Sequence, residues 1–346
     1  MHHDSASEER ALGIMTSMHI HQCAKLISTV SCRPATSLSS AFVSSPCCGR
    51  PSGRAPRLAR RSCGAAHRTC RHRAMTVAAA QQDASPDQAF TLVGSGRVGT
   101  ALAKLGSGSD AFIERGQPVN GPPGPIIVCT RNDDLQGVLD STPKDRREDL
   151  VFIQNGILQP WLDARGLGSN TQALVYFAVA KKGETPIDGR TDANPEGLTA
   201  VTGKHAQAFA GRLAHGDLSC KVLDQTQYKK SMLEKLIWIC AVMLVGAKNG
   251  NIKVGEVEKN HKDEMSTLIS ELASAGEAEL RVQLDDGVLE RLLAYSRSVA
   301  SFPTAVKEVP WRNGWFYDIS LQAKQEHKDD PCPTHSAWLK QVGAVA

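Results

Sequence analysis

A glycine-rich turn between an apolar run and a helix-forming run holds the clearest chemical signal in this sequence. The apolar or β-branched residues Phe90–Val93 lead directly into Gly94-Ser95-Gly96-Arg97-Val98-Gly99, and the helix-forming stretch Thr100–Leu105 follows. A strand, a tight glycine turn and a helix in this order let the backbone approach a pyrophosphate and direct a helix N-terminus at it. An ordinary turn between a strand and a helix is the alternative. The context on both sides favours dinucleotide binding.

Two charged residues after the glycine motif bear on the choice of cofactor. Glu114 lies twenty residues after Gly94, near the spacing at which a carboxylate meets the ribose hydroxyls of NAD. Arg115 and Arg97 supply two guanidinium groups near the same place, and these favour NADP because they pair with a 2′-phosphate. A solvated Glu–Arg pair at a strand end is the alternative interpretation.

Two further polar clusters follow apolar runs that are predicted strands. Thr130 and Arg131 lie in Cys129-Thr130-Arg131-Asn132-Asp133, after Ile126–Cys129, and Asn155 lies in Gln154-Asn155-Gly156, after Leu150–Ile153. Ligands of open α/β sheets bind at the carboxyl ends of strands, so we expect both clusters at one cleft. An Asn-Gly pair by itself more often marks only a turn.

A lysine begins the most apolar helical stretch of the chain. Lys235 is followed by mostly apolar residues through Met243. A lysine that faces a cleft from such a helix is partly desolvated, and desolvation lowers its pKa. A lowered pKa suits a proton donor to a carbonyl that is being reduced. The alternative is a lysine whose stem packs on the core while its ammonium pairs with Glu234 or Glu271.

The pattern of apolar runs predicts a parallel sheet followed by helices. We expect strands at Phe90–Val93, Phe112–Glu114, Ile126–Cys129, Leu150–Ile153 and Leu174–Val179, and hairpin-like strands within Gly189–Gly203. Continuous apolar strands indicate a sheet covered on both faces. The link from Glu114 to Ile126 is too short for a normal crossover helix, so the sheet domain lacks at least one unit.

From about Gln225 the pattern becomes helical, with long stretches free of proline at Met232–Lys248 and Asp263–Leu284. We therefore expect a dinucleotide-binding domain at 88–222 and a helical domain for substrate binding or dimerisation at 223–346. The longest apolar run, Leu236–Ala247, is twelve residues long. A membrane helix needs roughly 20, so we assign this run to a protein core and expect no membrane partner.

Residues 1–80 have the composition of a disordered organelle transit peptide. From Arg10 to Gln82 there are eleven Lys or Arg and no Asp or Glu, with many Ser, Ala and Cys. The basic-to-small stretch Arg71–Ala80 resembles a plastid processing region, which predicts the chloroplast stroma. A mitochondrial presequence and a disordered nucleic-acid-binding tail are the alternatives.

Without this leader the bulk properties change. The chain is +4 overall, but the leader's eleven basic residues exceed its three acidic ones by eight, which leaves the remainder at about −4. This balance does not support a nucleic-acid partner. The four remaining cysteines are scattered, so we expect free thiols in a reducing compartment. Cys332 and His335 have a zinc-like spacing but lack a second ligand pair, and we expect no metal.

Four motifs together resemble the ketopantoate reductase (2-dehydropantoate 2-reductase) family, with this chain a divergent plastid member. They are Gly94–Gly99, Val128-Cys129-Thr130-Arg131, Phe152–Gly156 and Glu234-Lys235-Leu236-Ile237-Trp238. Lys253–Val257 is also similar to the family's Gly-Glu-Leu segment, which follows the lysine helix. They occur in the family's order over residues 88 to 340.

The resemblance implies a Rossmann-like parallel-sheet domain and an all-α domain like the C-terminal domain of 6-phosphogluconate dehydrogenase. It implies NADPH as cofactor, reduction of a 2-oxo acid between the domains, and a possible homodimer. Gly94, Gly96 and Gly99 would hold the pyrophosphate, with Ser95 and Val98 in the same loop. Arg131 would replace a cofactor- or substrate-contacting lysine. Asn155 would contact the nicotinamide ribose or the substrate, and Lys235 would protonate the alkoxide.

The chain departs from the family where substrate is held. The family has asparagines four and eight residues after its lysine, and here these are Ile239 and Met243. Ser301 could replace a substrate-orienting serine, but Asn313 occupies the place of its glutamate. Each lost hydrogen bond costs about 1 kcal/mol or more, so we do not expect ketopantoate itself to bind well. Trp311-Arg312-Asn313-Gly314-Trp315 is either a pocket wall or a packed loop.

Three functions are compatible with these observations. The first is an NADPH-dependent oxidoreductase acting on a small 2-oxo-acid-like carbonyl, with Lys235 as acid and Asn155 as positioning group. The alternative is a non-catalytic NADP(H)-binding sensor or assembly protein, which Ile239, Met243 and Asn313 favour. A third possibility, a helical interaction module with a vestigial sheet, requires an empty glycine loop.

Overall fold

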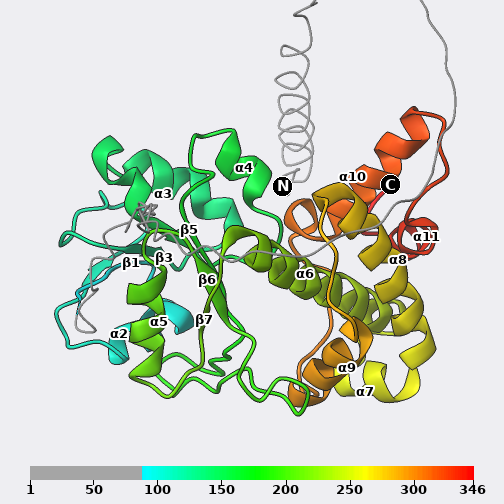
Figure 1. The fold of residues 1–346 in the computed structure, drawn as a ribbon, viewed down its shortest axis with the longest axis horizontal. Coiled ribbons are helices and arrows are strands. Elements are labelled where there is room, and N and C mark those ends of the chain that lie inside the picture. The colour runs from blue at the N-terminus through cyan, green and yellow to red at the C-terminus, as the bar shows by residue number, and fades with distance from the viewer. Residues whose placement is uncertain (1–87) are drawn as a thin grey trace, which may run out of the picture. The chain divides into compact units, whose positions relative to one another are not determined.

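The structure, a computed structural model, describes residues 88–346. Within the described residues seven strands form one sheet of order β2-β1-β3-β4-β5-β6-β7 (Figure 1). The first five strands are mutually parallel, β6 is antiparallel to β5, and β7 is parallel to β6. The strands are β1 (Thr91–Val93), β2 (Ala111–Ile113), β3 (Ile126–Val128), β4 (Leu150–Phe152), β5 (Thr171–Leu174), β6 (Ala200–Thr202) and β7 (Lys221–Val222).

Alternate residues of the central strands pack against helices on opposite faces of the sheet. Leu92, Ile127 and Val151 pack in the cluster that contains α2 (Arg97–Lys104) and α5 (Ala206–Ala214). The residue after each of these packs in the opposite cluster, with α3 (Leu135–Ser141) and α4 (Gln159–Asp163). Side chains of a strand point alternately to its two faces, so a strand buried on both faces must be apolar throughout.

The link between β2 and β3 contains no helix, as its length and prolines predicted. It turns at Gly124, whose φ is +121°, and packs Gly121 against β1, where a Cβ would lie 2.1 Å from the hydroxyl oxygen of Thr91. This close packing leaves β2 as the edge strand beside β1. The sheet therefore lacks the outer unit that a longer crossover would add.

Two strand predictions were wrong in position. The fifth strand is Thr171–Leu174, not Leu174–Val179, and within Gly189–Gly203 only Ala200–Thr202 is a strand. The strand begins with the polar residues Thr171 and Gln172, and both are buried. Burial of Thr171 is tolerated because its hydroxyl accepts a hydrogen bond from the backbone N of His205. The apolar run after Leu174 leaves the sheet, and its residues Phe177 and Val179 are buried by packing beside it.

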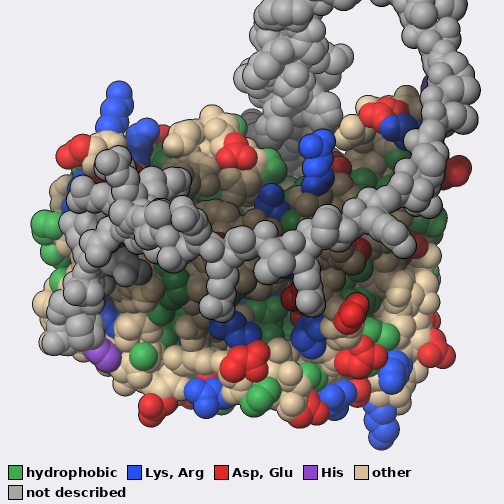
Figure 2. All heavy atoms as spheres, viewed as in Figure 1, with side chains coloured by type: hydrophobic (Ala, Val, Ile, Leu, Met, Phe, Trp, Pro, Cys, Tyr) green, Lys and Arg blue, Asp and Glu red, His purple; other side chains and the backbone are tan. Residues whose placement is uncertain are grey.

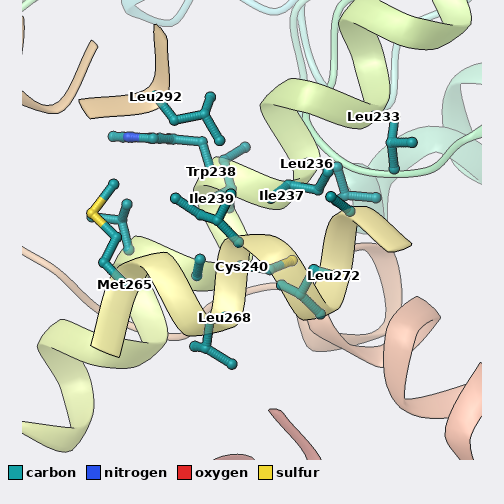
Figure 3. Close-up of a cluster of buried hydrophobic side chains, with 14 of the residues drawn as sticks. Leu233, Leu236, Ile237, Trp238, Ile239, Cys240, Met265, Leu268, Leu272 and Leu292 are labelled. Atoms are coloured by element: carbon teal, nitrogen blue, oxygen red, sulfur yellow. The ribbon is translucent and has the colours of Figure 1, made fainter. Parts of the chain in front are cut away.

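The chain from Gln225 onward is helical, and its helices pack around a hydrophobic core that they form together. Its helices are α6 (Gln225–Lys248), α7 (Val254–Asn260), α8 (Lys262–Leu280), α9 (Val288–Ser298), α10 (Asn313–Gln325) and α11 (Pro333–Gln341). Figure 3 shows Ile239 and Cys240 of α6 among side chains such as Leu268 of α8. The side chain of Asp224 caps α6 by accepting from the backbone N of Gln227 at 2.8 Å. The apolar stretch of α6 is a core helix, as its length predicted.

On the face drawn in Figure 2, acidic and basic side chains are interspersed along the lower part. None of the helices in residues 88–346 is long and apolar enough to span a membrane. The predicted transit peptide, 1–80, lies outside the described residues, so it and the stromal location stay predictions.

A buried ion pair fastens α5 to the start of the sheet. Arg212 of α5 is 1% exposed and bonds the carboxylate of Asp110 with both terminal nitrogens, at 2.6 and 2.9 Å. The same guanidinium donates to the carbonyls of Leu102 and Gln88, and its carbon lies 3.9 Å from the centre of the Phe90 ring. A charge buried in this way depends on its partner.

We expect Asp110→Ala to lower the free energy of unfolding by about 3 to 5 kcal/mol, because it leaves Arg212 buried without a counter-charge. Urea unfolding followed by circular dichroism measures the change. Asp285→Ala is the control, since that carboxylate is exposed and its pair with Lys230 should contribute less than about 1 kcal/mol. Equal losses for the two variants would contradict this account of the pair.

Candidate functional site

The three glycines of the Gly94–Gly99 turn have different structural roles. Gly94 has a φ of +102°, which side chains rarely tolerate. A Cβ on Gly99 would lie 2.2 Å from the carbonyl oxygen of Gly94, so the first turn of α2 packs directly on the end of β1. A Cβ on Gly96 would have no described atom within 4 Å. The backbone is thus open at the one place where a pyrophosphate would approach.

The helix after this turn begins at Arg97, and Gly96 is its N-cap residue. The Arg97 guanidinium donates to the carbonyls of Val179 and Ala180, at 3.3 and 3.2 Å. Its charge is therefore engaged by the segment that follows β5. The Val98 side chain packs toward the apolar cluster under α2. Of the predicted loop residues, Gly94 and Ser95 line the adjoining cavity.

A cavity of about 520 Å³ adjoins the glycine turn at the carboxyl ends of β2, β1 and β3. Its lining is Gly94, Ser95, Glu114, Arg115, Cys129, Thr130, Arg131 and Asp134. The topology thus brings Arg115 and Arg131 together with two carboxylates. Arg97, which was expected beside Arg115, is not in this lining and instead bonds the segment after β5. Arg115 pairs with Asp134 at 2.8 Å, not with its neighbour Glu114, and its side chain is 80% exposed. Burial raises the pKa of the Cys129 thiol to about 12, so thiolate chemistry is not available there.

The second polar cluster links the carboxyl ends of β4 and β3. Gln154 donates to the carbonyls of Val128 and Thr130, at 2.8 and 3.1 Å, which fixes the end of β4 beside the end of β3. The carbonyl of Asn155 accepts from the side chain of Asn132 at 3.2 Å.

The turn after Asn155 packs on the segment that precedes α10. Gly156 has a φ of +110°, and a Cβ there would lie 2.2 Å from the carbonyl oxygen of Trp311. That carbonyl accepts from the backbone N of Ile157 at 2.8 Å. The segment Trp311–Trp315 therefore packs against the predicted site through Trp311 and continues into the first turn of α10.

Lys235 is buried where α6 passes the carboxyl end of β5. The residue is 5% exposed, and its ammonium donates to the carbonyl of Val175, directly after β5. The nitrogen also lies 4.4 Å from the centre of the Tyr176 ring. Neither carboxylate considered as its partner binds it. Glu234 is bonded by Arg291 at 2.7 Å, and Glu271 accepts from the backbone at the start of α11.

This environment shifts the pKa of Lys235 to about 7. Burial is the main cause, because it penalises the charged form, and the positive charge of Arg312 adds to it. Arg312 itself bonds Glu308, while its buried Nε has no hydrogen-bond partner among residues 88–346. Near neutral pH the lysine is therefore present in both protonation states, which is the condition for efficient proton transfer.

The strand order places this lysine and the glycine turn on one edge of the sheet. Val175 follows the carboxyl end of β5, and Gly94 follows that of β1 in the same parallel set. The two strands are three spacings apart, or about 14 Å. The turn at Asn155 follows β4, which lies between β3 and β5. All predicted site positions thus lie along one edge, where open α/β sheets bind ligands.

Comparison with solved structures identifies the fold. The 2-dehydropantoate 2-reductase of Methylococcus capsulatus aligns with a TM-score of 0.56 and 13% identity, over 74% of this chain and 97% of its own. The dimeric ketopantoate reductase of Staphylococcus aureus aligns at 0.53 and 16%, over 74% and 99%. A D-mandelate dehydrogenase solved with NADH and anilino(oxo)acetate aligns at 0.53 and 13%, over 74% and 99%. No family profile and no curated protein matches the sequence.

The chain has the ketopantoate reductase fold. This confirms the predicted architecture, a Rossmann-like, mainly parallel sheet followed by a helical domain. The structural alignments confirm, at the level of the fold, the resemblance drawn from the four short motifs. Identities of 13 to 16% leave the reaction open.

The side chains beside Lys235 differ from those of the family motif. Ile239 is 6% exposed and belongs to the helical core, and Met243 packs against that core. Asn313 is also buried, and its side-chain oxygen lies 2.9 Å from Nε2 of His335. Ser301 is exposed. The positions that departed from the family motif thus serve packing, and Asn313 and His335 bond each other.

Sequence reasoning did not anticipate the immediate surroundings of Lys235. The Val175 carbonyl, the Tyr176 ring and the Arg312 charge come from segments 60 residues before and 77 residues after it. The cluster Trp311–Trp315, with its two aromatic residues around Arg312, was the one available signal. Its proximity to Lys235 depends on the packing of that loop against Gly156.

We expect Lys235→Met to stabilise the protein at pH 6 by about 2 to 4 kcal/mol, because the folded chain then no longer buries an ammonium. Between pH 7 and about 10.5 the unfolded lysine holds a proton that the folded one has lost, so wild-type stability rises with pH there. The advantage of Met should therefore fade toward pH 10. Chemical unfolding at pH 6 and pH 10 measures it, and an advantage that is the same at both values would contradict the lowered pKa.

Proposed function

We propose that the protein is an NADPH-dependent oxidoreductase that reduces a small 2-oxo-acid-like carbonyl at the carboxyl edge of its sheet. The observation that carries this proposal is the position of Lys235, whose pKa is lowered to about 7, on the same edge as an open glycine turn. The neighbouring fold relatives act as reductases or dehydrogenases by their titles, and one was solved with NADH.

The residues at the glycine turn fit a dinucleotide. The open backbone at Gly96 suits a pyrophosphate, and the N-terminus of α2 adds favourable partial charge. Arg115 and Arg131 line the cavity at the ends of β2 and β3, where the adenosine ribose of a dinucleotide would lie. Two guanidinium groups there support a 2′-phosphate, hence NADP. The nicotinamide would supply a hydride to the substrate carbon.

The side chains near Lys235 would bind and orient the substrate. Lys235 would donate a proton from Nζ to the carbonyl oxygen as negative charge develops there. Arg312 lies close enough to act on the charge of Lys235, and its unpaired Nε suits a substrate carboxylate. The side chain of Asn155, on the turn between the two ends of the site, would position the nicotinamide ribose or the substrate.

A second candidate function has its own supporting observation. Ile239 and Met243 fill the face of α6 beyond Lys235 with core side chains, and Asn313 is bonded to His335. A protein that binds NADP(H) without turning over a carbonyl acid, as a sensor or assembly partner, would need no polar groups at these positions. Turnover therefore decides between the two functions.

The full-length protein should bind NADPH, and Gly96→Ala should weaken that binding about tenfold or more, because its methyl group fills the space that the pyrophosphate needs. Nucleotide fluorescence measures the affinity. Arg115→Ala should reduce the preference for NADPH over NADH, since it removes one guanidinium from the 2′-phosphate site.

The control for this experiment is stability. Gly96 has backbone angles that alanine adopts freely, so Gly96→Ala should unfold at the same denaturant concentration as wild type or slightly higher. Gly99→Ala should lose stability, because its Cβ meets a backbone carbonyl. Equal NADPH affinity in wild type and Gly96→Ala would remove the glycine turn from the binding site.

Oxidation of NADPH with a panel of short 2-oxo acids should be measurable, and Lys235→Ala should lower kcat by about a hundredfold or more. For the wild type, kcat should fall as pH rises above about 7, because the proton donor is then lost. The Lys235→Ala variant should lose this pH dependence.

Two results would contradict this proposal, the first for the activity and the second for the role of Lys235. NADPH binding without turnover on any 2-oxo acid of the panel would support the non-catalytic function. Turnover that is undiminished in Lys235→Ala would show that the proton comes from another group.

A further inference from the structure

A second polar cavity lies beside α6, one to two turns before Lys235. We call it the α6 pocket. It has a volume of about 410 Å³, within the range of small-molecule sites. Gln227 and Ser231 line it from α6, and Leu284 closes it from the segment before α9. The described linings of this pocket and of the glycine-turn cavity share no residue. The α6 pocket is therefore separate from the glycine-turn cavity.

The lining carries equal numbers of opposite charges. Three ion pairs border the pocket, Lys221–Glu196 at 2.7 Å, Lys230–Asp285 at 2.9 Å and Arg291–Glu234 at 2.7 Å. The last pair uses two guanidinium nitrogens and is mostly buried, so it forms a fixed frame. In the other two, Glu196 is 52% and Asp285 77% exposed. Such exposed pairs contribute little, so their lysines can turn to a ligand at small cost.

One buried acceptor in the lining has no partner. Asn194 is 9% exposed, and its amide nitrogen donates to Glu196 at 3.3 Å. Its oxygen is buried and receives no hydrogen bond from any described residue. An unsatisfied buried acceptor costs about 1 to 3 kcal/mol, which a ligand donor would recover. Asn194 and Glu196 thus offer acceptors together, on the side of the pocket that Lys221 also borders.

The pocket also reaches the surroundings of Lys235. The Tyr176 ring lines the pocket and lies 4.4 Å, centre to nitrogen, from the Lys235 ammonium. The adjacent Glu234 lines it as well. An occupant would therefore contact the aromatic ring on which the lysine rests.

We propose that the α6 pocket binds a free α-amino acid. Its carboxylate would lie between Lys221 and Lys230, and its ammonium would donate to the Asn194 oxygen and the Glu196 carboxylate. A zwitterion fits because the lining is balanced in charge and offers donors and acceptors from different residues. This inference does not depend on the proposed reductase activity.

Binding is tested on the full-length protein with the proteinogenic amino acids, each at millimolar concentration. Thermal denaturation identifies those that stabilise the protein, and calorimetric titration gives the Kd of the strongest. Two analogues of that amino acid follow, its carboxamide, which lacks the carboxylate, and its deaminated acid, which lacks the ammonium. We expect each analogue to bind about tenfold or more weakly, since each loses charge-assisted hydrogen bonds.

Two variants and a control locate the site. Lys230→Gln and Asn194→Leu should each weaken binding about tenfold, and Lys230→Gln alters only a partly exposed side chain, so it should fold normally. Lys328→Gln removes a lysine from another exposed ion pair, with Glu326, and should leave the Kd unchanged. The proposal is overturned if no amino acid stabilises the protein, if either analogue binds as well, or if both pocket variants keep the wild-type Kd.

Discussion

The burial of one ammonium group, that of Lys235, is the constraint on which the candidate site depends. A buried lysine is tolerated only where neighbouring groups offset part of the lost hydration. Here the Val175 carbonyl and the Tyr176 ring do so, and both belong to the segment that leaves the sheet after β5. The contact therefore also fastens α6 to the sheet edge. Because Arg312 adds a second positive charge, the site keeps the lysine ready to lose its proton.

The sheet determines what this lysine can act on. Five parallel strands direct their carboxyl ends to one edge, so the glycine turn, the turn at Asn155 and Val175 follow one another in the order of their strands. Val175 in turn binds Lys235 of α6. Two close backbone contacts, Gly99 on Gly94 and Gly156 on Trp311, hold the two turns in place. Neither contact involves a side chain that could serve chemistry, and both require glycine.

Apolar packing limits the site from the other side. Ile239 and Met243 continue the face of α6 that begins at Lys235. Ile239 lies within the helical core (Figure 3), and Met243 packs against it. The open volume beside α6 lies in the opposite direction, toward Ser231 and Gln227, and is lined with charges. Relative to the family motif, polar groups are thus missing after the lysine and a polar cavity lies before it. The fold is shared with ketopantoate reductases, but the chemistry next to the lysine differs.

The sequence by itself determined the central strands, the glycine turn, the absence of a crossover helix after Glu114 and the start of the helical part near Gln225. These follow from local rules, since apolar triplets, glycines and prolines act within a few residues of themselves. It did not determine β5, where the buried hydroxyl of Thr171 is satisfied by a hydrogen bond from a residue 34 positions away. The sequence also did not predict which residues contact or act on Lys235. Val175, Tyr176 and Arg312 meet it only because the sheet edge, α6 and the loop before α10 pack together, and a pKa depends on neighbours in space rather than in sequence.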